Sequence, residues 1–228
     1  PMFGRATTFS NAVAKFDARL DQLSWNDGTS IQALTGMAKL APATDCETLV
    51  ACVIFRIITN PHKSKLPVIY LMDSITKNSG PQYQQLFGQH VGDLMPAVYD
   101  LTDNASDRTP LFKLLTLWKN RAAFHPDVLE RIQKAMEFSE QRRAVKPVAS
   151  GWPNVLPSGC EQLPGIELQI AQYFYRSIFA LATPTEEELN FTKDSLLVLM
   201  RLMIPLNNQL GRPQDPEIER LIEQYELV

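Results

Sequence analysis

Residues 66–80 read LPVIYLMDSITKNSG. At about 100° per residue, a helix over this stretch places Tyr70, Asp73 and Lys77 on one stripe. The apolar residues that fall on the opposite side are Val68, Leu71, Met72 and Ile75. Gly80, which a proline follows, ends the helix. The stretch therefore predicts a helix that packs into a core by one face and offers a phenol, a carboxylate and an ammonium by the other.

Helical spacing of apolar residues recurs through the first 145 residues, with intervals of three and four. It predicts helices over residues 9–25, 31–40, 45–60, 66–80, 82–101, 107–121 and 126–143. Thr29 or Ser30 can cap the second helix, and Pro96 should bend or split the fifth. No stretch alternates polar and apolar residues between hairpin turns, as strands do. We therefore expect an all-α fold, a right-handed superhelix of seven to eight short helices.

The last third of the chain differs in composition. Residues 146–165 are rich in proline and glycine and predict a linker or an ordered strap. Residues 166–181 and 185–205 then predict two helices that are apolar nearly all round, followed by a short helix over residues 215–225. Helices of that kind need a partner surface. We expect a domain over residues 3–145 and a helical extension over residues 166–228 that packs on it, on another protein or on a second copy.

Composition excludes several classes of function. The 228 residues carry a net charge of −3 and a pI near 5.7, whereas general nucleic-acid binders are usually strongly basic. We expect any nucleic-acid contact to be weak. The longest apolar run, residues 196–204, is interrupted by Arg201 and is far shorter than the roughly 20 residues that span a bilayer.

Metal and cofactor chemistry has no support in the sequence. The three cysteines have no metal-ligand spacing and indicate reduced thiols in the cytosol or nucleus. His62, His90 and His125 are scattered, with no partner at ligand spacing. No phosphate-binding glycine loop, nucleophile elbow or paired carboxylate set is recognisable. We therefore expect no catalytic residue, metal or cofactor.

The helix over residues 66–80 also carries a resemblance. Residues 70–78, YLMDSITKN, resemble the YxxDSIxKN signature of the CTD-interacting domain (CID), the module by which cleavage, polyadenylation and termination factors bind the tail of RNA polymerase II. Residues 23–35 and 108–118 are similar to two further family stretches, in the right order and spacing. The likeness covers roughly the first 140 residues, and residues 150–228 match no part of the minimal module.

The resemblance implies a groove that binds an extended, phosphorylated peptide built on the heptad tyrosine-serine-proline-threonine-serine-proline-serine. The implied peptide contacts are Tyr70, Asp73, Ser74, Lys77 and Asn78, of which Asp73 would accept a hydrogen bond from the peptide tyrosine. The implied phosphate contacts are Lys113, Arg108, Asn26 and Ser30. Some family members have arginine where this chain has Lys113; lysine keeps the charge but lacks the bidentate fork. The turn from Asn26 to Ser30 would instead offer free amides at a helix N-terminus.

The expected function is that of a nuclear, non-enzymatic adaptor that binds the phosphorylated polymerase tail during mRNA 3′-end processing or termination. Two alternatives stay open. One is a membrane-traffic adaptor of the related VHS/ENTH superhelix type, although the chain lacks the basic amphipathic leading helix that would favour lipid. The other is a helical scaffold with a degenerate groove that dimerises, or docks a protein, through residues 166–228. The preferred phosphoserine and the larger assembly are not evident from the sequence.

Overall fold

The computed structural model of the chain describes residues 9–60, 62–102, 104–145 and 186–211. Within these residues the secondary structure is entirely helical, which confirms the all-α prediction. The α-helices are α1 (Asn11–Leu20), α2 (Gly28–Leu40), α3 (Cys46–Thr59), α4 (His62–Asn78), α5 (Pro81–Asp100), α6 (Ala105–Asn120), α7 (Pro126–Val145) and α9 (Glu186–Gln209). A short 3-10 helix, η1 (Ala43–Asp45), precedes α3.

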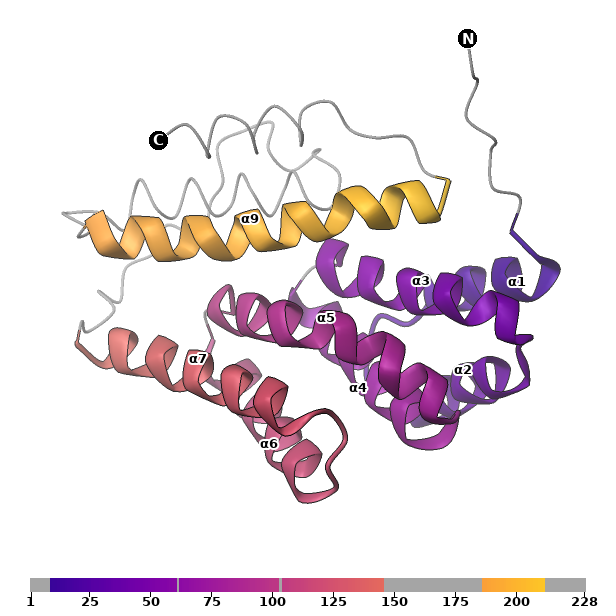
Figure 1. Cartoon of the computed structure of the whole chain (residues 1–228), viewed down its shortest axis with the longest axis horizontal. Helices are drawn as coiled ribbons and strands as arrows, with labels where there is room; N and C mark the ends of the chain where they lie inside the picture. The colour runs from indigo at the N-terminus through magenta and orange to yellow at the C-terminus, as the bar shows by residue number, and fades with distance from the viewer. Residues whose placement is uncertain (1–8, 61, 103, 146–185, 212–228) are drawn as a thin grey trace, which may run out of the picture.

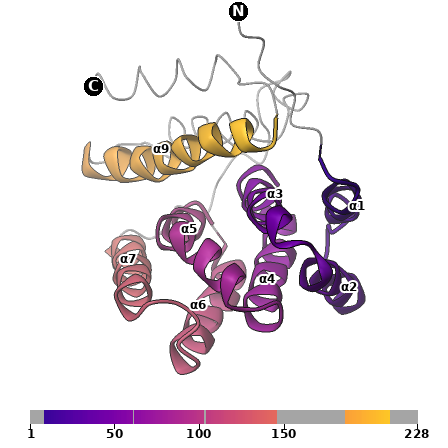
Figure 2. The ribbon, with the colours of Figure 1, turned by 45° about the vertical axis from the view of Figure 1, so that its right-hand side comes forward.

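Helix α4 lies in the middle of the stack, in contact with α2, α3, α5 and α6. Viewed nearly end-on, the helices follow one another around the molecule, with α4 between α2 on one side and α6 on the other (Figure 2). Helix α7 packs on α5 and α6. Helix α9 runs across α3 and α5 (Figure 1) and contacts both. The outer edge formed by α2, α4 and α6 is thus on the side of the molecule away from α9.

The buried face of α4 is the one predicted from the sequence. Its core residues are no more than 1% exposed, and they are Val68, Ile69, Leu71, Met72 and Ile75. Burying an aliphatic side chain of this size contributes roughly 1.5–3 kcal/mol, so the register of α4 is fixed by its apolar side. Trp118 of α6 is also fully buried.

Two local predictions about helix ends and breaks are corrected. Helix α2 begins at Gly28, and its cap is Asp27, whose carboxylate accepts hydrogen bonds from the backbone N–H groups of Thr29 and Ser30. Neither Thr29 nor Ser30 is itself the cap, because an aspartate in extended backbone conformation reaches both amides. Helix α5 continues through Pro96, so the alternative of a split helix is wrong, while the bend at Pro96 stays a prediction.

The predicted helix over residues 185–205 corresponds to α9. The predicted linker over residues 146–165 and the helices over residues 166–181 and 215–225 lie outside the described residues. Helix α9 joins the core of the rest of the molecule through Leu199, Met203, Leu206 and Leu210. The described part of the extension therefore packs on the chain's own domain.

A buried carboxylate also ties α9 to the domain. Asp100 ends α5 with a side chain that is 2% exposed, and it accepts hydrogen bonds from Ser139 of α7 (2.8 Å) and Ser195 of α9 (3.3 Å). Arg142 of α7 forms an ion pair with the same carboxylate. Burial outweighs these contacts and raises the pKa of Asp100. One enclosed side chain thus joins three helices.

A second buried charge joins α3 to α4. Lys65 is 4% exposed, and its Nζ donates hydrogen bonds of 2.6 Å to the carbonyls of Ile57 and Ile58. These carbonyls belong to the last turn of α3, where an α-helix leaves its acceptors unpaired. Burial lowers the pKa of Lys65 to about 7. The ammonium therefore serves as an internal cap for α3.

Candidate functional site

The outer face of α4 carries all the residues that the sequence predicted to contact a peptide. Tyr70, Asp73 and Ser74 are half-buried, while Lys77 and Asn78 near the end of the helix are exposed. Burial raises the pKa of the Tyr70 phenol, which therefore remains a hydrogen-bond donor at neutral pH. The helix thus presents this face to solvent, as the 3.6-residue period requires once its apolar side is buried.

Asp73 is held from one side by α6 and by the residue that follows it. The indole Nε1 of Trp118 donates a hydrogen bond of 2.6 Å to Asp73 Oδ1, and the Arg121 guanidinium forms an ion pair with the same oxygen. The Asp73 side chain is 21% exposed and that of Arg121 30%. No hydrogen bond from the described residues reaches Oδ2. The carboxylate is thus fixed by one oxygen and can accept from a ligand with the other.

The rigidity of this arrangement comes from the core. Trp118 is fully buried, and its ring meets that of Phe124 edge to face, with centroids 5.0 Å apart and planes at 87°. Edge-to-face pairs of this kind contribute about 0.5–1.5 kcal/mol beyond the buried area. Because the indole cannot turn without disturbing that packing, the position of Asp73 Oδ1 is set by the interior of the protein.

Ser74 and Asn78 make contacts within the helix and with α2. The Ser74 hydroxyl lies 2.8 Å from that of Thr35 on α2 and hydrogen-bonds with it. The side-chain amide of Asn78 donates a bond of 2.8 Å to the carbonyl of Ser74. These bonds set the separation of α2 and α4 at the edge of the face. The predicted peptide contacts of Ser74, Lys77 and Asn78 remain predictions.

Helix α6 adds a second exposed stripe next to Asp73. Lys113 and Leu117 stand four residues apart and share one side of the helix, and Arg121 follows directly after the end of α6. Leu117 is 55% exposed, and Lys113 is exposed with no hydrogen bond or ion pair to a described residue. An apolar side chain thus lies between two cations, beside a carboxylate. Sequence reasoning missed Leu117 and Arg121, although their spacing from Lys113 was visible.

The structure gives Arg108 a different role from the one expected. Only 8% of Arg108 is exposed; its Nε donates to Glu140 of α7 at 2.6 Å and its NH1 to the carbonyl of Thr102 at 3.0 Å. A guanidinium used in this way links α6 to α7 and to the end of α5. These internal contacts do not favour a phosphate contact of Arg108, which stays a prediction.

The turn from Asn26 to Ser30 stays a prediction as a phosphate site, and its internal contacts do not favour it. Its amides, at Thr29 and Ser30, already bind the Asp27 carboxylate at 3.1 Å each. The Ser30 hydroxyl donates to the same carboxylate, and this bond is the largest cause that lowers the pKa of Asp27. Because an internal anion occupies the helix N-terminus, a phosphate there would meet a like charge.

Neither a metal site nor a membrane-spanning helix is found among the described residues. Within the described residues, His, Cys, Asp and Glu side chains nowhere gather in threes to form a metal site. None of the helices in the described ranges combines the length and the apolar character needed to cross a bilayer.

The chain is similar in sequence to a known domain family and to two yeast proteins. The family model described as "CID domain" matches residues 14–132. The chain is 31% identical over 127 residues to Protein PCF11 of Saccharomyces cerevisiae, which covers 54% of this chain and 20% of that protein. It is 30% identical over 125 residues to an uncharacterized protein of Schizosaccharomyces pombe, covering 51% and 19% respectively. The chain thus spans about a fifth of the length of these relatives.

A solved structure is also similar. It is described as the "crystal structure of the rpr of pcf11", and it matches with a TM-score of 0.52 and 30% sequence identity. The match covers 55% of this chain and 98% of that chain. The shared helical architecture confirms the fold class expected from the sequence.

Proposed function

Because the chain belongs to the CID domain family, we propose that it is an adaptor that binds the C-terminal tail of RNA polymerase II in mRNA 3′-end processing. Membership of the family confirms the resemblance found in residues 70–78. The matched region, residues 14–132, contains both helices of the Asp73 site. We propose further that the chain acts in the nucleus and without enzymatic activity, as a binding module.

The observation that carries this proposal is the state of the Asp73 carboxylate. Oδ1 is held by Trp118 and Arg121, while Oδ2 is open. A phenol hydroxyl needs an acceptor when its ring is buried, and Oδ2 supplies one without any internal bond being broken. Tyr70 on one side and Leu117 on the other offer apolar surface for the ring. The site thus suits a tyrosine of an extended peptide.

A phosphate on the peptide would meet two cations, Lys113 of α6 and Arg121 directly after that helix. A phosphoserine carries close to two negative charges and three acceptor oxygens. Lys113 has no described partner, and the Arg121 guanidinium has donors beyond those used for Asp73. We propose Lys113 as the main phosphate contact, supported by Arg121. Since a lysine binds phosphate as a point charge, we expect a moderate phosphate preference.

The C-terminal extension completes the module in this proposal. The described apolar residues of α9 pack on α3 and α5 of the same chain, which favours this arrangement over a scaffold that dimerises through α9. We propose residues 3–145 as the CID and residues 166–228 as the extension packed on it.

Titration of fluorescent heptad peptides, unmodified and phosphorylated at each serine in turn, tests the proposal. The full chain is compared with Asp73→Ala and Lys113→Glu, and Lys15→Glu serves as the control, because Lys15 is an exposed lysine on α1. We expect micromolar affinity, which corresponds to about 8 kcal/mol of binding free energy. Asp73→Ala should abolish measurable binding, and Lys113→Glu should remove the phosphate preference while Lys15→Glu keeps it.

The outcomes separate the parts of the proposal. Binding that survives Asp73→Ala at full strength would rule out the Asp73 face as the site. An affinity that does not depend on phosphorylation would exclude Lys113 as a phosphate contact and leave the tail-binding function standing.

A further inference from the structure

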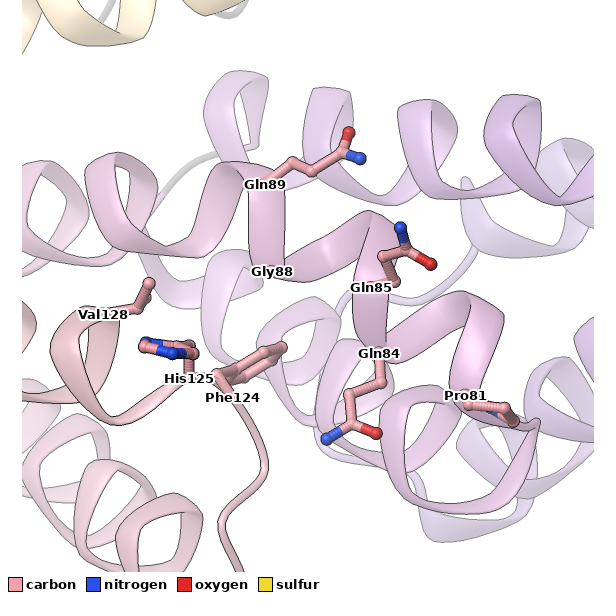
Figure 3. Close-up of a pocket in the computed structure, with 8 residues that line it drawn as sticks. All are labelled: Pro81, Gln84, Gln85, Gly88, Gln89, Phe124, His125 and Val128. Atoms are coloured by element: carbon pink, nitrogen blue, oxygen red, sulfur yellow. The ribbon is translucent and has the colours of Figure 1, made fainter.

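A pocket lies between α5 and the loop that joins α6 to α7, outside the Asp73 site (Figure 3). Its volume is about 330 Å³, and it is lined by Pro81, Gln84, Gln85, Gly88, Gln89, Phe124, His125 and Val128. Gln85 and Gln89 stand at its rim on α5, with His125 opposite them (Figure 3). The volume is at the low end of the roughly 300–1,000 Å³ typical of ligand sites.

The chemistry of the lining is that of an uncharged, hydrogen-bonding surface over an apolar floor. No Asp, Glu, Lys or Arg is among the lining residues. Gln85 and Gln89 are exposed and make no hydrogen bond to a described residue, so each offers a free amide donor and acceptor. Gly88 carries no side chain, and this permits a ligand backbone to approach α5 closely. Such a surface suits an uncharged peptide segment with small apolar side chains.

The pocket and the Asp73 site share a single loop. Arg121 at the start of this loop pairs with Asp73, whereas Phe124 and His125 at its end line the pocket. The loop turns at Ala122, which has a φ of 49°, and Gln84 holds it by donating to the carbonyl of Ala123 at 2.8 Å. The Trp118 indole lies between the two sites, bonded to Asp73 and stacked edge to face on Phe124.

We propose that this pocket is a second peptide subsite, which binds an uncharged stretch of the same polymer whose tyrosine binds at Asp73. The assignment of the polymer rests on the proposed function; the assignment of the pocket rests on its neutral lining and on the loop that it shares with the Asp73 site. A peptide long enough to occupy both sites binds the second site as an intramolecular event. Longer peptides should therefore bind more tightly than a single heptad, with no additional charge.

Gly88→Leu is the variant that blocks the pocket. A Cβ at this position would lie 3.6 Å from Phe124, an ordinary contact, and leucine is a better helix former than glycine by roughly 0.5–1 kcal/mol, so the fold should persist. Gln141→Leu is the matched control, because it adds the same side chain at an exposed position of α7 about 20 Å along the helix from Val128. The double variant Gln85→Ala/Gln89→Ala removes the free amides without adding bulk.

The first arm measures affinity by isothermal titration for peptides of one and three unphosphorylated heptads. In the wild type and in Gln141→Leu the longer peptide should bind roughly tenfold more tightly, beyond the statistical factor of three. In Gly88→Leu and in the glutamine double variant that gain should vanish while single-heptad affinity is unchanged. An equal gain in all four proteins would overturn the proposal.

The second arm does not depend on the Asp73 site. The blocked hexapeptide Ser-Pro-Thr-Ser-Pro-Ser, which has no tyrosine and no charge, is titrated into ¹⁵N-labelled full chain. We expect amide shifts at Gln85, Gly88, Gln89 and Val128 that Gly88→Leu removes and Asp73→Asn retains. If these shifts are absent in the wild type, the pocket is not a peptide subsite, even if tyrosine peptides bind at Asp73. Conversely, the shifts would remain if Asp73 proved irrelevant to tyrosine.

Discussion

Asp73 and Asp100 have partners of the same kinds but differ in burial and in the number of carboxylate oxygens that accept hydrogen bonds. Each is an aspartate near an arginine and a side-chain donor: Trp118 and Arg121 for Asp73, and Ser139, Ser195 and Arg142 for Asp100. Asp100 is 2% exposed and accepts at both oxygens, whereas Asp73 is 21% exposed and accepts at only one. We infer that a free acceptor at the surface, rather than a charged residue as such, would distinguish the proposed binding site from a structural link.

Replacing Asp100 should produce the largest effect on stability. Asp100→Ala removes the buried carboxylate that pairs with Arg142, and removing one member of a buried pair costs about 3–5 kcal/mol. Chemical denaturation should show this loss, while the folded protein keeps its affinity for peptide. The control is Asp93→Ala, because the Asp93–Arg131 pair is more than half exposed and such pairs contribute about 0–1 kcal/mol. Equal losses in the two variants would contradict the account.

Lys65 extends the comparison to a buried cation. Burial lowers its pKa to about 7 in the folded chain, against roughly 10.4 when unfolded. Between these values the unfolded chain binds more protons, so the unfolding free energy rises with pH. From pH 7 to pH 9 the wild type should gain about 2 kcal/mol relative to Lys65→Met. Lys39→Met, at an exposed lysine, should show no such gain, and parallel pH profiles for all three proteins would refute the assignment.

Asp73→Asn should affect binding more than stability. Asparagine keeps Oδ1 for the Trp118 indole but replaces Oδ2 with an N–H donor, so the acceptor offered to a ligand is lost. We expect at least roughly tenfold weaker binding of a tyrosine peptide, about 1.4 kcal/mol. The unfolding free energy should change by about 1 kcal/mol or less, because the Arg121 contact is partly solvated. If Asp73→Asn loses stability but keeps its affinity for the peptide, Asp73 has a structural role like that of Asp100 and does not bind the peptide.

Lys113→Gln should have the smallest effect. The exposed ammonium contributes to phosphate binding through a solvent-screened interaction. Affinity for a phosphorylated heptad should fall a few-fold and that for the unmodified heptad should not change, as measured by fluorescence anisotropy at low and moderate salt. If both peptides lose affinity equally, Lys113 contacts the peptide chain rather than its phosphate.

The sequence predicted the features of the site that depend on periodicity. The apolar positions of α4 fixed which face is buried, and the outward positions of Tyr70 and Asp73 followed from the same 3.6-residue period. These inferences need only one helix at a time, which is why a single sequence sufficed.

The missed features depend on pairs of residues far apart in the chain. Arg121 pairs with Asp73, which lies 48 residues earlier in the chain. The loop after Arg121 turns at Ala122, which has a positive φ, and the sequence has no glycine there to indicate such a turn. The Arg108 side chain donates a hydrogen bond to Glu140, which lies 32 residues later in the chain. The cap of α2 was misplaced by two or three positions because Asp27, Thr29 and Ser30 are all good capping residues. Tertiary contacts decided the places of Arg121 and Arg108, whereas the cap of α2 was a choice among neighbouring residues of similar preference.

A double-mutant cycle between the protein and its ligand tests the central claim most directly. Heptad peptides with tyrosine and with phenylalanine are titrated against the wild type and Asp73→Asn under identical conditions. The account predicts that the missing hydroxyl weakens binding to the wild type about tenfold and leaves binding to Asp73→Asn nearly unchanged, a coupling near 1.4 kcal/mol. If both proteins lose the same affinity on the change to phenylalanine, Asp73 Oδ2 does not bind the tyrosine hydroxyl.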